Sequence, residues 1–307
     1  MSNNIFIFPG QGSQKIGMGK DFYEHSDIAK EMIEKASKRI GLDFTQLLFE
    51  ENTQLEQTEF TQPAILLVSL IAHRLFTLDY KKLPVAVLGH SLGEFSALSA
   101  VGAIDYLDAV ELVHQRGLLM KRACEGINAG MMALLGLDDA TVESITCKQR
   151  EEGKKVWPAN YNGDGQIVIA GNKEDLSSIE PIFKEAGAKK AVLLSMSVAS
   201  HCPLLASAQD ELSIYLEKWI KNSFCAPVIS NVSASEYQDK KNATILLANQ
   251  LIEPVKYKQS ILHVEAHADC FIEFGGNVLK GLNKRITQKT THSITDMKSL
   301  EEVLALF

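Results

Sequence analysis

The sequence lacks paired cysteines and any motif that would join them. Its five cysteines are scattered, odd in number and never in a C-x-x-C spacing, which argues against both a disulfide framework and a zinc site. A basic tract is also missing, since 31 Lys and Arg residues face 38 Asp and Glu residues and the net charge is −7. Without a run of cations to neutralise successive phosphates, nucleic-acid binding is not expected. These absences favour a reducing compartment, the cytoplasm.

Long apolar runs are missing as well, and none approaches the roughly 20 residues of a membrane-spanning helix. The N-terminal segment has no cationic residue and only four apolar residues before Pro9, so it predicts a first strand rather than a signal peptide. The other proportions are ordinary for a globular protein, with 46% hydrophobic and 22% charged residues. A chain of 307 residues is long enough for one large domain with an insert.

The loop at residues 9–14 lacks the glycines that a phosphate cradle needs. A G-x-G-x-x-G motif would require glycine at position 15, which is Lys15. A P-loop ending at positions 19–20 would require glycine at 14 and Ser or Thr at 21, where the chain has Gln14 and Asp21. Both nucleotide-binding motifs are therefore excluded.

The most informative motif that is present is a serine between two glycines. Gly89 and Gly93 flank Ser91 in a G-x-S-x-G spacing, with an apolar run at 85–88 before it and a small-residue helix expected over 96–103. Such a strand–turn–helix holds a hydroxyl at the C-terminal edge of a sheet, and the helix N-terminus favours developing negative charge. The arrangement suits acyl transfer through a covalent ester. A chance pattern is the alternative, but the strand and the helix that the motif requires are both predicted here.

An arginine lies on the apolar face of the next expected helix, over residues 105–124 with Asp105 as its N-cap. At about 100° per residue, Arg116 projects into the middle of an apolar stripe. The stripe consists of Ala109, Leu112, Val113, Leu119, Met120 and Ala123. A guanidinium on a buried face is costly unless it meets an anion. That anion is either a fixed Asp or Glu in the core or an anionic ligand, and periodicity does not separate the two.

The pattern of residues 128–197 predicts a separate small unit. Strands are expected at 131–136, 155–161, 167–170 and 191–197, with helices at 138–152 and 174–186. This β-α-β-β-α-β order is that of a ferredoxin-like subdomain. Elsewhere strands (5–8, 85–88, 228–232, 271–274) alternate with helices (61–78, 243–251, 259–268, from 277, 299–306), which predicts a mostly parallel sheet covered on both faces. The expected fold is α/β, with a large hydrolase-like catalytic domain formed by residues 1–127 and 198–307.

A serine nucleophile needs a base, and His201 is the best-placed histidine. It follows the expected strand 191–197 in a short loop, at the sheet edge where α/β proteins carry their sites. Four other histidines fall inside expected helices, and His90 lies within the elbow itself, too close to bend back easily. A capping or loop histidine is the alternative for His201. No Asp or Glu adjacent to it presents itself as an orienting group, but a backbone carbonyl would serve.

Six blocks carry a resemblance to the malonyl-CoA:acyl-carrier-protein transacylase family over essentially the whole chain. They are FPGQGSQ (8–14), TQPA (61–64), GHSLGE (89–94), QRG (115–117), SHC (200–202) and NQL (249–251). The resemblance implies that Ser91 is the acylated serine and His201 its general base. It further implies that the carbonyl of Gln250 orients His201, which fits the missing carboxylate.

The resemblance assigns the remaining site residues too. It implies an oxyanion hole made by the backbone N–H groups of Gln11 and Leu92, and it implies that Arg116 binds the free carboxylate of a malonyl group. Two departures stand out: residues 274–277 replace the Gly-Pro-Gly-like turn usual in the family, and Ser200 stands where some relatives have Phe. The first affects the shape of that loop. The second leaves room for a branched acyl group.

The implied activity is ping-pong malonyl transfer from malonyl-CoA to the phosphopantetheine thiol of acyl carrier protein, for fatty-acid synthesis. No metal or resident cofactor is expected, and the expected partners exclude nucleic acid and membrane, with the chain acting as a cytoplasmic monomer. Three alternatives stay open: a serine esterase or thioesterase, a non-catalytic carrier-docking subunit, and an acyltransferase that serves a polyketide assembly line. The first needs no arginine on an apolar face, and the second needs no intact Ser91, His201 and Arg116.

Overall fold

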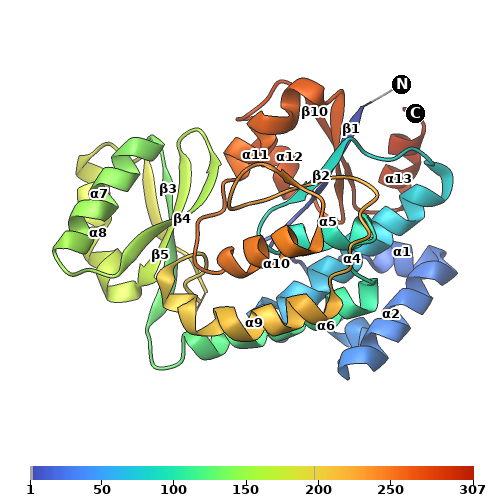
Figure 1. Cartoon of the computed structure of the whole chain (residues 1–307), viewed down its shortest axis with the longest axis horizontal. Coiled ribbons are helices and arrows are strands. Elements are labelled where there is room, and N and C mark those ends of the chain that lie inside the picture. Colours follow the sequence, from blue (N-terminus) through green and yellow to red (C-terminus); the bar gives the residue numbers. More distant parts are fainter. Residues whose placement is uncertain (1–2, 197) are drawn as a thin grey trace.

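The fold of the computed structural model, which describes residues 3–196 and 198–307, is built on two sheets (Figure 1). The larger sheet has the strand order β10-β9-β1-β2-β7-β8 and is parallel except for the pairing of β8 with β7. Its strands are β1 (Asn4–Phe8), β2 (Ala86–Gly89), β7 (Val228–Ile229), β8 (Glu236–Tyr237), β9 (Cys270–Phe274) and β10 (Thr290–Ile294). Each parallel neighbour is reached through helices, as the alternating sequence pattern predicted.

Strand β1 shows how the large sheet is buried on both faces. Phe6 and Phe8 join the cluster that contains the helices α2, α4, α5, α6 and α9, whereas Ile5 and Ile7 pack on the other face with residues of α11 and α12. These helices are α2 (Asp27–Ile40), α4 (Thr58–Asp79), α5 (Leu92–Ala100), α6 (Tyr106–Ala123), α9 (Ala206–Trp219), α11 (Tyr257–Val264) and α12 (Val278–Asn283). Burial on both faces explains why the strand is apolar at every position from 5 to 8.

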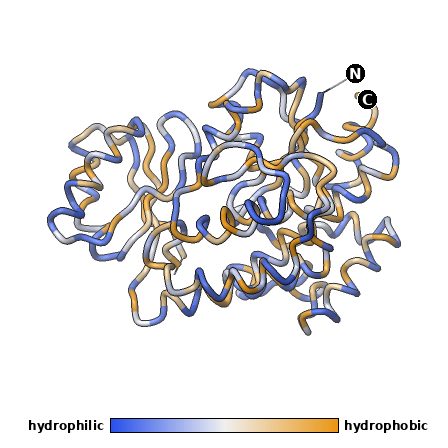
Figure 2. Tube along the Cα trace, in the orientation of Figure 1, coloured by the Kyte–Doolittle hydropathy of each residue, from blue (hydrophilic) through white to orange (hydrophobic). Residues whose placement is uncertain are grey.

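Helix α4 is the central helix of the larger core. In the part of the chain that the structure describes, it alone is long and apolar enough to cross a membrane by length and composition. Of its most apolar 18-residue window, 78% is buried inside the protein, and its neighbours include α2, α5 and α6. The apolar character on all sides therefore follows from its place in the core. Figure 2 colours the whole chain by hydropathy and shows hydrophobic residues in both parts of the molecule.

The smaller sheet is antiparallel, with strand order β4-β5-β3-β6. Its elements are β3 (Ala129–Leu135), α7 (Asp139–Glu151), β4 (Val156–Gly163), β5 (Gln166–Asn172), α8 (Lys173–Glu185) and β6 (Lys190–Leu193). The two helices pack with the sheet around a core of their own at the left of Figure 1. The α/β class, with a mostly parallel sheet and a second sheet from the insert, is confirmed in these terms.

Several boundaries differ from the sequence-based expectation. Helix α4 begins at Thr58 rather than at Thr61, because the Thr61 hydroxyl donates back to carbonyls of the preceding turn, including that of Leu55, instead of capping. The strand expected at 191–197 ends at Leu193, and Ser197 lies outside the described residues. The strand expected at 228–232 has only two residues in β7, since the chain turns at 230–234.

Some elements were not predicted at all. They are α1 (Lys20–His25), α2, α3 (Phe44–Phe49), α9, β8 and the edge strand β10, besides the 3-10 turns at Gln54–Glu56 and Pro203–Leu205. The remaining helices α10 (Lys240–Asn249) and α13 (Met297–Leu304) lie close to their expected ranges. The polar residues Thr290, Thr291, His292 and Ser293 fill most of β10, so the apolar run that marked the inner strands is missing there.

Candidate active site

Ser91 lies at the bend between β2 and α5, in a backbone conformation that serine rarely adopts. Its φ is 53° and its ψ is −107°. The turn is held because the Ser91 N–H donates to Asn231 Oδ1 at 2.6 Å, while the Asn231 amide donates to the carbonyl of Gly89 at 2.7 Å. A Cβ on Gly89 would lie 1.9 Å from the backbone of Gly93, so that position requires glycine. Strain of this kind persists only where the surroundings enforce it, and it concentrates at functional sites.

His201 reaches Ser91 across the fold. The distance from Ser91 Oγ to His201 Nε2 is 2.8 Å, and His201 Nδ1 lies 2.6 Å from the backbone carbonyl of Gln250. A carbonyl accepts only, so Nδ1 carries the proton and Nε2 is free to accept the serine proton. Burial, and then the charge of Arg116, lower the pKa of His201 to about 3. The imidazole is therefore neutral at physiological pH, the state that a general base requires.

Arg116 projects from α6 to the same place. Its Nη2 lies 3.3 Å from Ser91 Oγ and 3.0 Å from the side-chain oxygen of Gln250, and its Nη1 donates to Gln62 at 2.7 Å. The guanidinium carbon also lies 5.1 Å from the centre of the Phe95 ring. The apolar stripe thus placed this side chain correctly: it is 1% exposed, yet it opens onto the cavity beside the serine.

Only neutral groups bond to Arg116. Within residues 3–196 and 198–307, no carboxylate forms an ion pair with it, and its buried Nε has no hydrogen-bond partner. Burial lowers its pKa to about 10, which still leaves a cation at neutral pH. The sequence left two candidates for the anion beside Arg116. Among the described residues, the first of them, an Asp or Glu in direct contact with the guanidinium, is absent. The guanidinium therefore remains available to bind the carboxylate of an anionic ligand directly.

These side chains line a cavity of about 270 Å³ between the two sheets. Gln11, Leu92 and Ser200 also line it, together with residues of the small sheet such as Met131 and Asn162. Leu92 is the first residue of α5, so its N–H has no partner within the helix and lies beside the nucleophile. All six site residues expected from the sequence are thus gathered at or directly behind one cavity. Their roles stay predictions.

Several residues around the cavity were missed by sequence reasoning. His90 bonds to Asn162, which lies near the end of β4, at 2.7 Å. Behind Ser91, Asn231 and Glu94 are buried and bonded to each other and to the side chain of Gln250. A charged residue at 94, inside a helix of otherwise apolar and small residues, was the one signal available, by the same argument that singled out Arg116.

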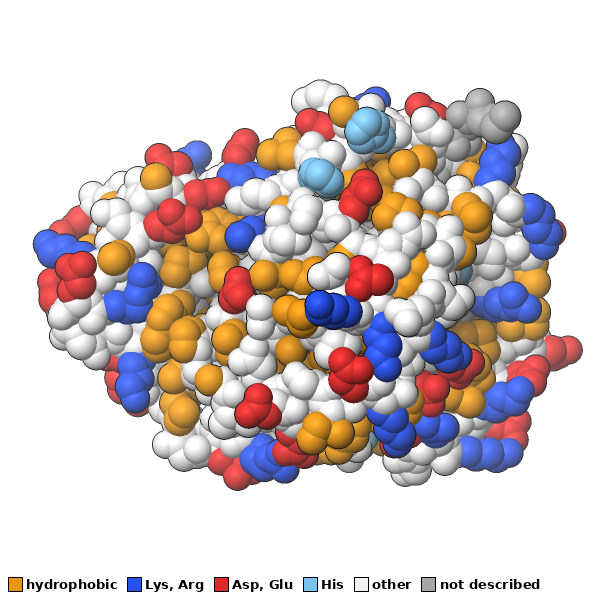
Figure 3. Space-filling view, viewed as in Figure 1, with side chains coloured by type: hydrophobic (Ala, Val, Ile, Leu, Met, Phe, Trp, Pro, Cys, Tyr) orange, Lys and Arg blue, Asp and Glu red, His pale blue; other side chains and the backbone are white. Residues whose placement is uncertain are grey.

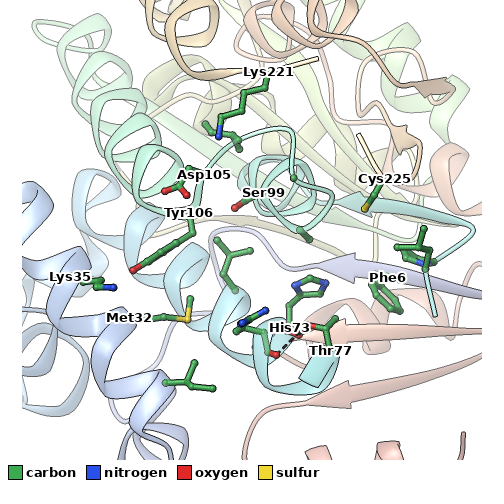
Figure 4. A pocket seen from close by; sticks show the side chains of 18 of the residues that line it. Phe6, Met32, Lys35, His73, Thr77, Ser99, Asp105, Tyr106, Lys221 and Cys225 are labelled. Atoms are coloured by element: carbon green, nitrogen blue, oxygen red, sulfur yellow. Dashed lines mark hydrogen bonds between the residues drawn. The ribbon is translucent and has the colours of Figure 1, made fainter. Parts of the chain in front are cut away.

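A larger cavity, of about 720 Å³, lies elsewhere and is lined by none of the predicted site residues. Figure 4 shows its lining, with His73 and Phe6 beside Thr77, and Lys221 above Asp105. Among the described residues, no group of three His, Cys, Asp or Glu side chains is placed to hold a metal ion, and all five cysteines are unpaired.

A hydroxyl on a strained strand-to-helix turn, paired with a neutral histidine, defines the class of serine acyltransferases and hydrolases. Comparison with known proteins narrows the class. The family described as "Acyl transferase domain" matches residues 5–304. The malonyl CoA-acyl carrier protein transacylase of Escherichia coli K12 is 39% identical over 296 residues, covering 95% of this chain and 96% of the relative.

Solved structures agree with this likeness. The crystal structure of malonyl-CoA:acyl carrier protein transacylase from Helicobacter pylori is 45% identical, with a TM-score of 0.97, and the match covers 100% of this chain and 98% of that one. A malonyl-transacylase in complex with a type II polyketide acyl-carrier protein is 35% identical, with a TM-score of 0.95 and full coverage of both chains. The chain belongs to the malonyl-CoA:acyl carrier protein transacylase family, so the resemblance in its six motifs is confirmed.

Proposed function

We propose that this protein transfers the malonyl group of malonyl-CoA to the phosphopantetheine thiol of an acyl carrier protein. One observation carries the proposal beyond the family likeness. A buried cation with no carboxylate in direct contact among the described residues opens onto the same cavity as the Ser91–His201 pair, 3.3 Å from the serine oxygen. An acyl group that ends in a carboxylate is the substrate that such a cavity suits.

The first half-reaction loads the serine. Ser91 Oγ attacks the thioester carbonyl while His201 Nε2 takes the hydroxyl proton, and the collapsing intermediate breaks the C–S bond. The same proton then passes from His201 to the departing CoA sulfur. The N–H groups of Gln11 and Leu92 are proposed to hold the oxyanion, and such donors are typically worth about 10²–10³ in rate each. The carbonyl of Gln250 keeps the imidazole in the required tautomer.

The second half-reaction repeats these steps in reverse. The carrier thiol gives its proton to His201 and attacks the acyl-serine carbonyl, and the Ser91 oxygen leaves with that proton. Both thiols thus use one site in turn, which is a ping-pong sequence. The neutral imidazole at rest serves both directions, because it accepts a proton from either nucleophile.

Arg116→Ala is expected to lower the rate of malonyl loading by about 10- to 100-fold, since one charge-assisted hydrogen bond contributes roughly 1.5–3 kcal/mol. Acetyl loading should be unchanged or faster, because acetyl has no carboxylate. Arg122→Ala on the same helix is the control, as Arg122 bonds to Glu211 at the surface. Stopped-flow loading with each acyl-CoA measures the ratio. Equal losses for both acyl groups would contradict the role of Arg116.

Hydrolysis and transfer are separated by the fate of the acyl-serine. The proton on His201 Nδ1 is held by a carbonyl rather than by the carboxylate of a hydrolase triad. For a transferase, holo carrier protein should discharge the acyl-serine far faster than water does. Release of free malonate that outpaces transfer would favour the esterase alternative. A polyketide carrier discharging faster than a fatty-acid carrier would move the protein to the polyketide pathway, in line with the partner of the 35% identical relative.

The carrier is proposed to dock on a basic rim formed by Lys189, Lys190, Lys280, Lys284 and Arg285. All five are exposed. Arg285 bonds to Gln166, which lines the cavity, and Lys189 lies against Gly136 beside the turn between β4 and β5. Elsewhere charges of both signs are intermixed, as on the face shown in Figure 3. Carrier proteins are usually acidic, so a cationic rim at the cavity mouth would attract them.

Replacing Lys189, Lys284 and Arg285 by Glu should raise the KM for holo carrier protein by about tenfold at low salt, and by less at high salt, because exposed charges are screened. The kcat should change little. Lys82→Glu with Lys221→Glu, at the distant 720 Å³ cavity, is the control. Initial rates of transfer at several salt concentrations provide the measurement. An unchanged carrier KM with unchanged salt dependence would rule out this docking surface.

The domain boundaries, the compartment and the oligomeric state are proposals too. We infer a large hydrolase-like domain of residues 1–127 and 198–307 with a ferredoxin-like subdomain at 128–197, supported by the separate core and the antiparallel order of the small sheet. We also infer a cytoplasmic monomer without metal, resident cofactor, membrane or nucleic acid. The net charge of −7 and the unpaired cysteines support that inference.

A further inference from the structure

A buried carboxylate lies directly behind the catalytic groups. Glu94, on α5, is 1% exposed and accepts hydrogen bonds from the Asn231 N–H at 3.0 Å, the Tyr237 hydroxyl at 2.9 Å and the Gln250 side-chain amide at 2.7 Å. The reaction proposed above gives it no part. A carboxylate so deep in the protein is expensive to keep unless its charge is compensated.

The compensating charge is Arg116, and the two are joined through one side chain. The amide of Gln250 donates to Glu94 Oε2 at 2.7 Å, and its oxygen accepts from Arg116 Nη2 at 3.0 Å. In the described chain, no carboxylate contacts Arg116 directly. Glu94 therefore acts as its counter-charge through the intervening side chain of Gln250. The unliganded site is therefore close to neutral as a whole.

A malonyl carboxylate on Arg116 changes this balance. The buried site then holds two anions and one cation, and the second anion raises the free energy of the charged form of Glu94. We propose that Glu94 is the counter-charge of Arg116 and takes up a proton from solvent when the malonyl carboxylate enters the cavity. The inference rests on the proposed function and adds a pH-dependent control of its acyl selectivity.

Few other groups around Glu94 titrate near neutral pH. Burial already raises the pKa of Glu94 to about 7 in the free protein, with Arg116 among the groups that lower it. Tyr237 on β8 has a pKa well above its usual value and the pKa of His201 is lowered to about 3, so both side chains stay uncharged, while burial also lowers the pKa of His90. Asn231 and Gln250 carry no charge. Glu94 is thus the group nearest the malonyl site whose charge changes between pH 6 and 8.

The direction of the pH effect follows from this linkage. Malonyl binding raises the pKa of Glu94 further, so the malonyl group is bound best when Glu94 is protonated and less well as the pH rises. The ratio of malonyl to acetyl loading rates should fall about three- to tenfold between pH 6 and 8. Taking the ratio cancels effects on His201 and on the CoA phosphates, since acetyl-CoA shares them.

Glu94→Gln separates charge from geometry. Its side-chain oxygen can still accept from Asn231 and Gln250, and its NH2 can donate to the Tyr237 hydroxyl, so every hydrogen bond has a replacement. The loading ratio of this variant should be flat with pH, equal to wild type near pH 6 and about three- to tenfold higher near pH 8. Glu273→Gln is the matched control, because Glu273 is a fully buried carboxylate bonded to backbone N–H groups away from the cavity.

A calorimetric measurement covers the case in which Glu94→Gln fails to fold. Binding of malonyl-CoA to Ser91→Ala, titrated at pH 7 in buffers of different ionisation enthalpy, should show net proton uptake that acetyl-CoA does not show. A wild-type loading ratio that is flat from pH 6 to 8, or binding without proton uptake, would overturn the role of Glu94 while leaving malonyl transfer intact. Absence of any malonyl adduct on the wild-type protein would instead refute the proposed function.

Discussion

Ser91→Ala is expected to abolish the malonyl adduct and to reduce transfer by about 10⁴-fold or more, as loss of a covalent nucleophile does in comparable serine enzymes. The reason is positional as well as chemical. Its Oγ lies 2.8 Å from Nε2 of the neutral His201 and 3.3 Å from Arg116, and in the described part of the chain no other hydroxyl lining the cavity bonds to both of these side chains. Water in the vacated space cannot form the acyl-enzyme intermediate that a ping-pong reaction needs.

The matched control for that variant is Ser96→Ala. Ser96 lies on the same helix, is fully buried and has no hydrogen-bond partner for its hydroxyl, so its loss should leave loading unchanged. The bond from the Ser91 N–H to Asn231 survives in the alanine variant, which should keep the turn folded. Intact-protein mass spectrometry after mixing with malonyl-CoA gives the readout. A persistent adduct on Ser91→Ala would place the nucleophile elsewhere.

His201→Ala is expected to slow both half-reactions by about 10²–10⁴-fold, the usual contribution of a general base. Malonyl and acetyl loading should fall together, in contrast to the selective loss expected for Arg116→Ala. His263→Ala, an exposed histidine on α11, is the control. Rapid-quench loading rates provide the comparison. A loss confined to one acyl group would show that His201 acts on substrate binding rather than on the serine proton.

The pH dependence of wild-type acetyl loading tests the same residue. Because burial lowers the pKa of His201 to about 3, the imidazole stays neutral as the pH falls through the ordinary histidine range. The acid limb of the profile should therefore lie well below pH 6 and reflect the lowered pKa. An acid limb centred near 6.5 would mean that the base titrates like an exposed histidine, contrary to its enclosure between Ser91 and Gln250.

The site residues that could be predicted from the sequence are those marked by patterns of neighbouring residues. The elbow around Ser91 combines a strand, two glycines and a helix within fifteen residues, and Arg116 is conspicuous because a cation interrupts an apolar stripe. In both cases a polar or charged side chain stands where the surrounding pattern favours a small or apolar one. Such conflicts are expected at functional sites, where local rules give way to chemistry.

The part that could not be predicted depends on contacts between distant segments. Asn231 holds the Ser91 turn from 140 positions away, and Gln250 links Arg116 to Glu94 from the end of α10. No local pattern announces such partners, because an isolated asparagine or glutamine is equally common in surface turns. Strand β10 was missed for a related reason: it lies at the sheet edge, where polar residues replace the apolar run.

The position of His201 was predicted in part from local sequence, but it also depends on contacts with distant segments. The sequence placed it in a loop after a strand, which is correct, but β6 ends at Leu193 and the loop is longer than expected. The histidine has a φ of 61°, so its backbone, like that of Ser91, is held in a rare conformation by tertiary contacts. Its orientation toward Ser91 depends on the carbonyl of Gln250, 49 positions away.

The most direct test of the account follows one acyl group through both half-reactions. Wild-type protein is mixed with malonyl-CoA, digested and mapped by mass spectrometry, and a second aliquot receives holo acyl carrier protein before analysis. We expect one malonyl group on the peptide that contains Ser91, and its complete transfer to the carrier thiol. A malonyl group on any other residue, or an acyl-serine that water clears while the carrier stays unloaded, would contradict it.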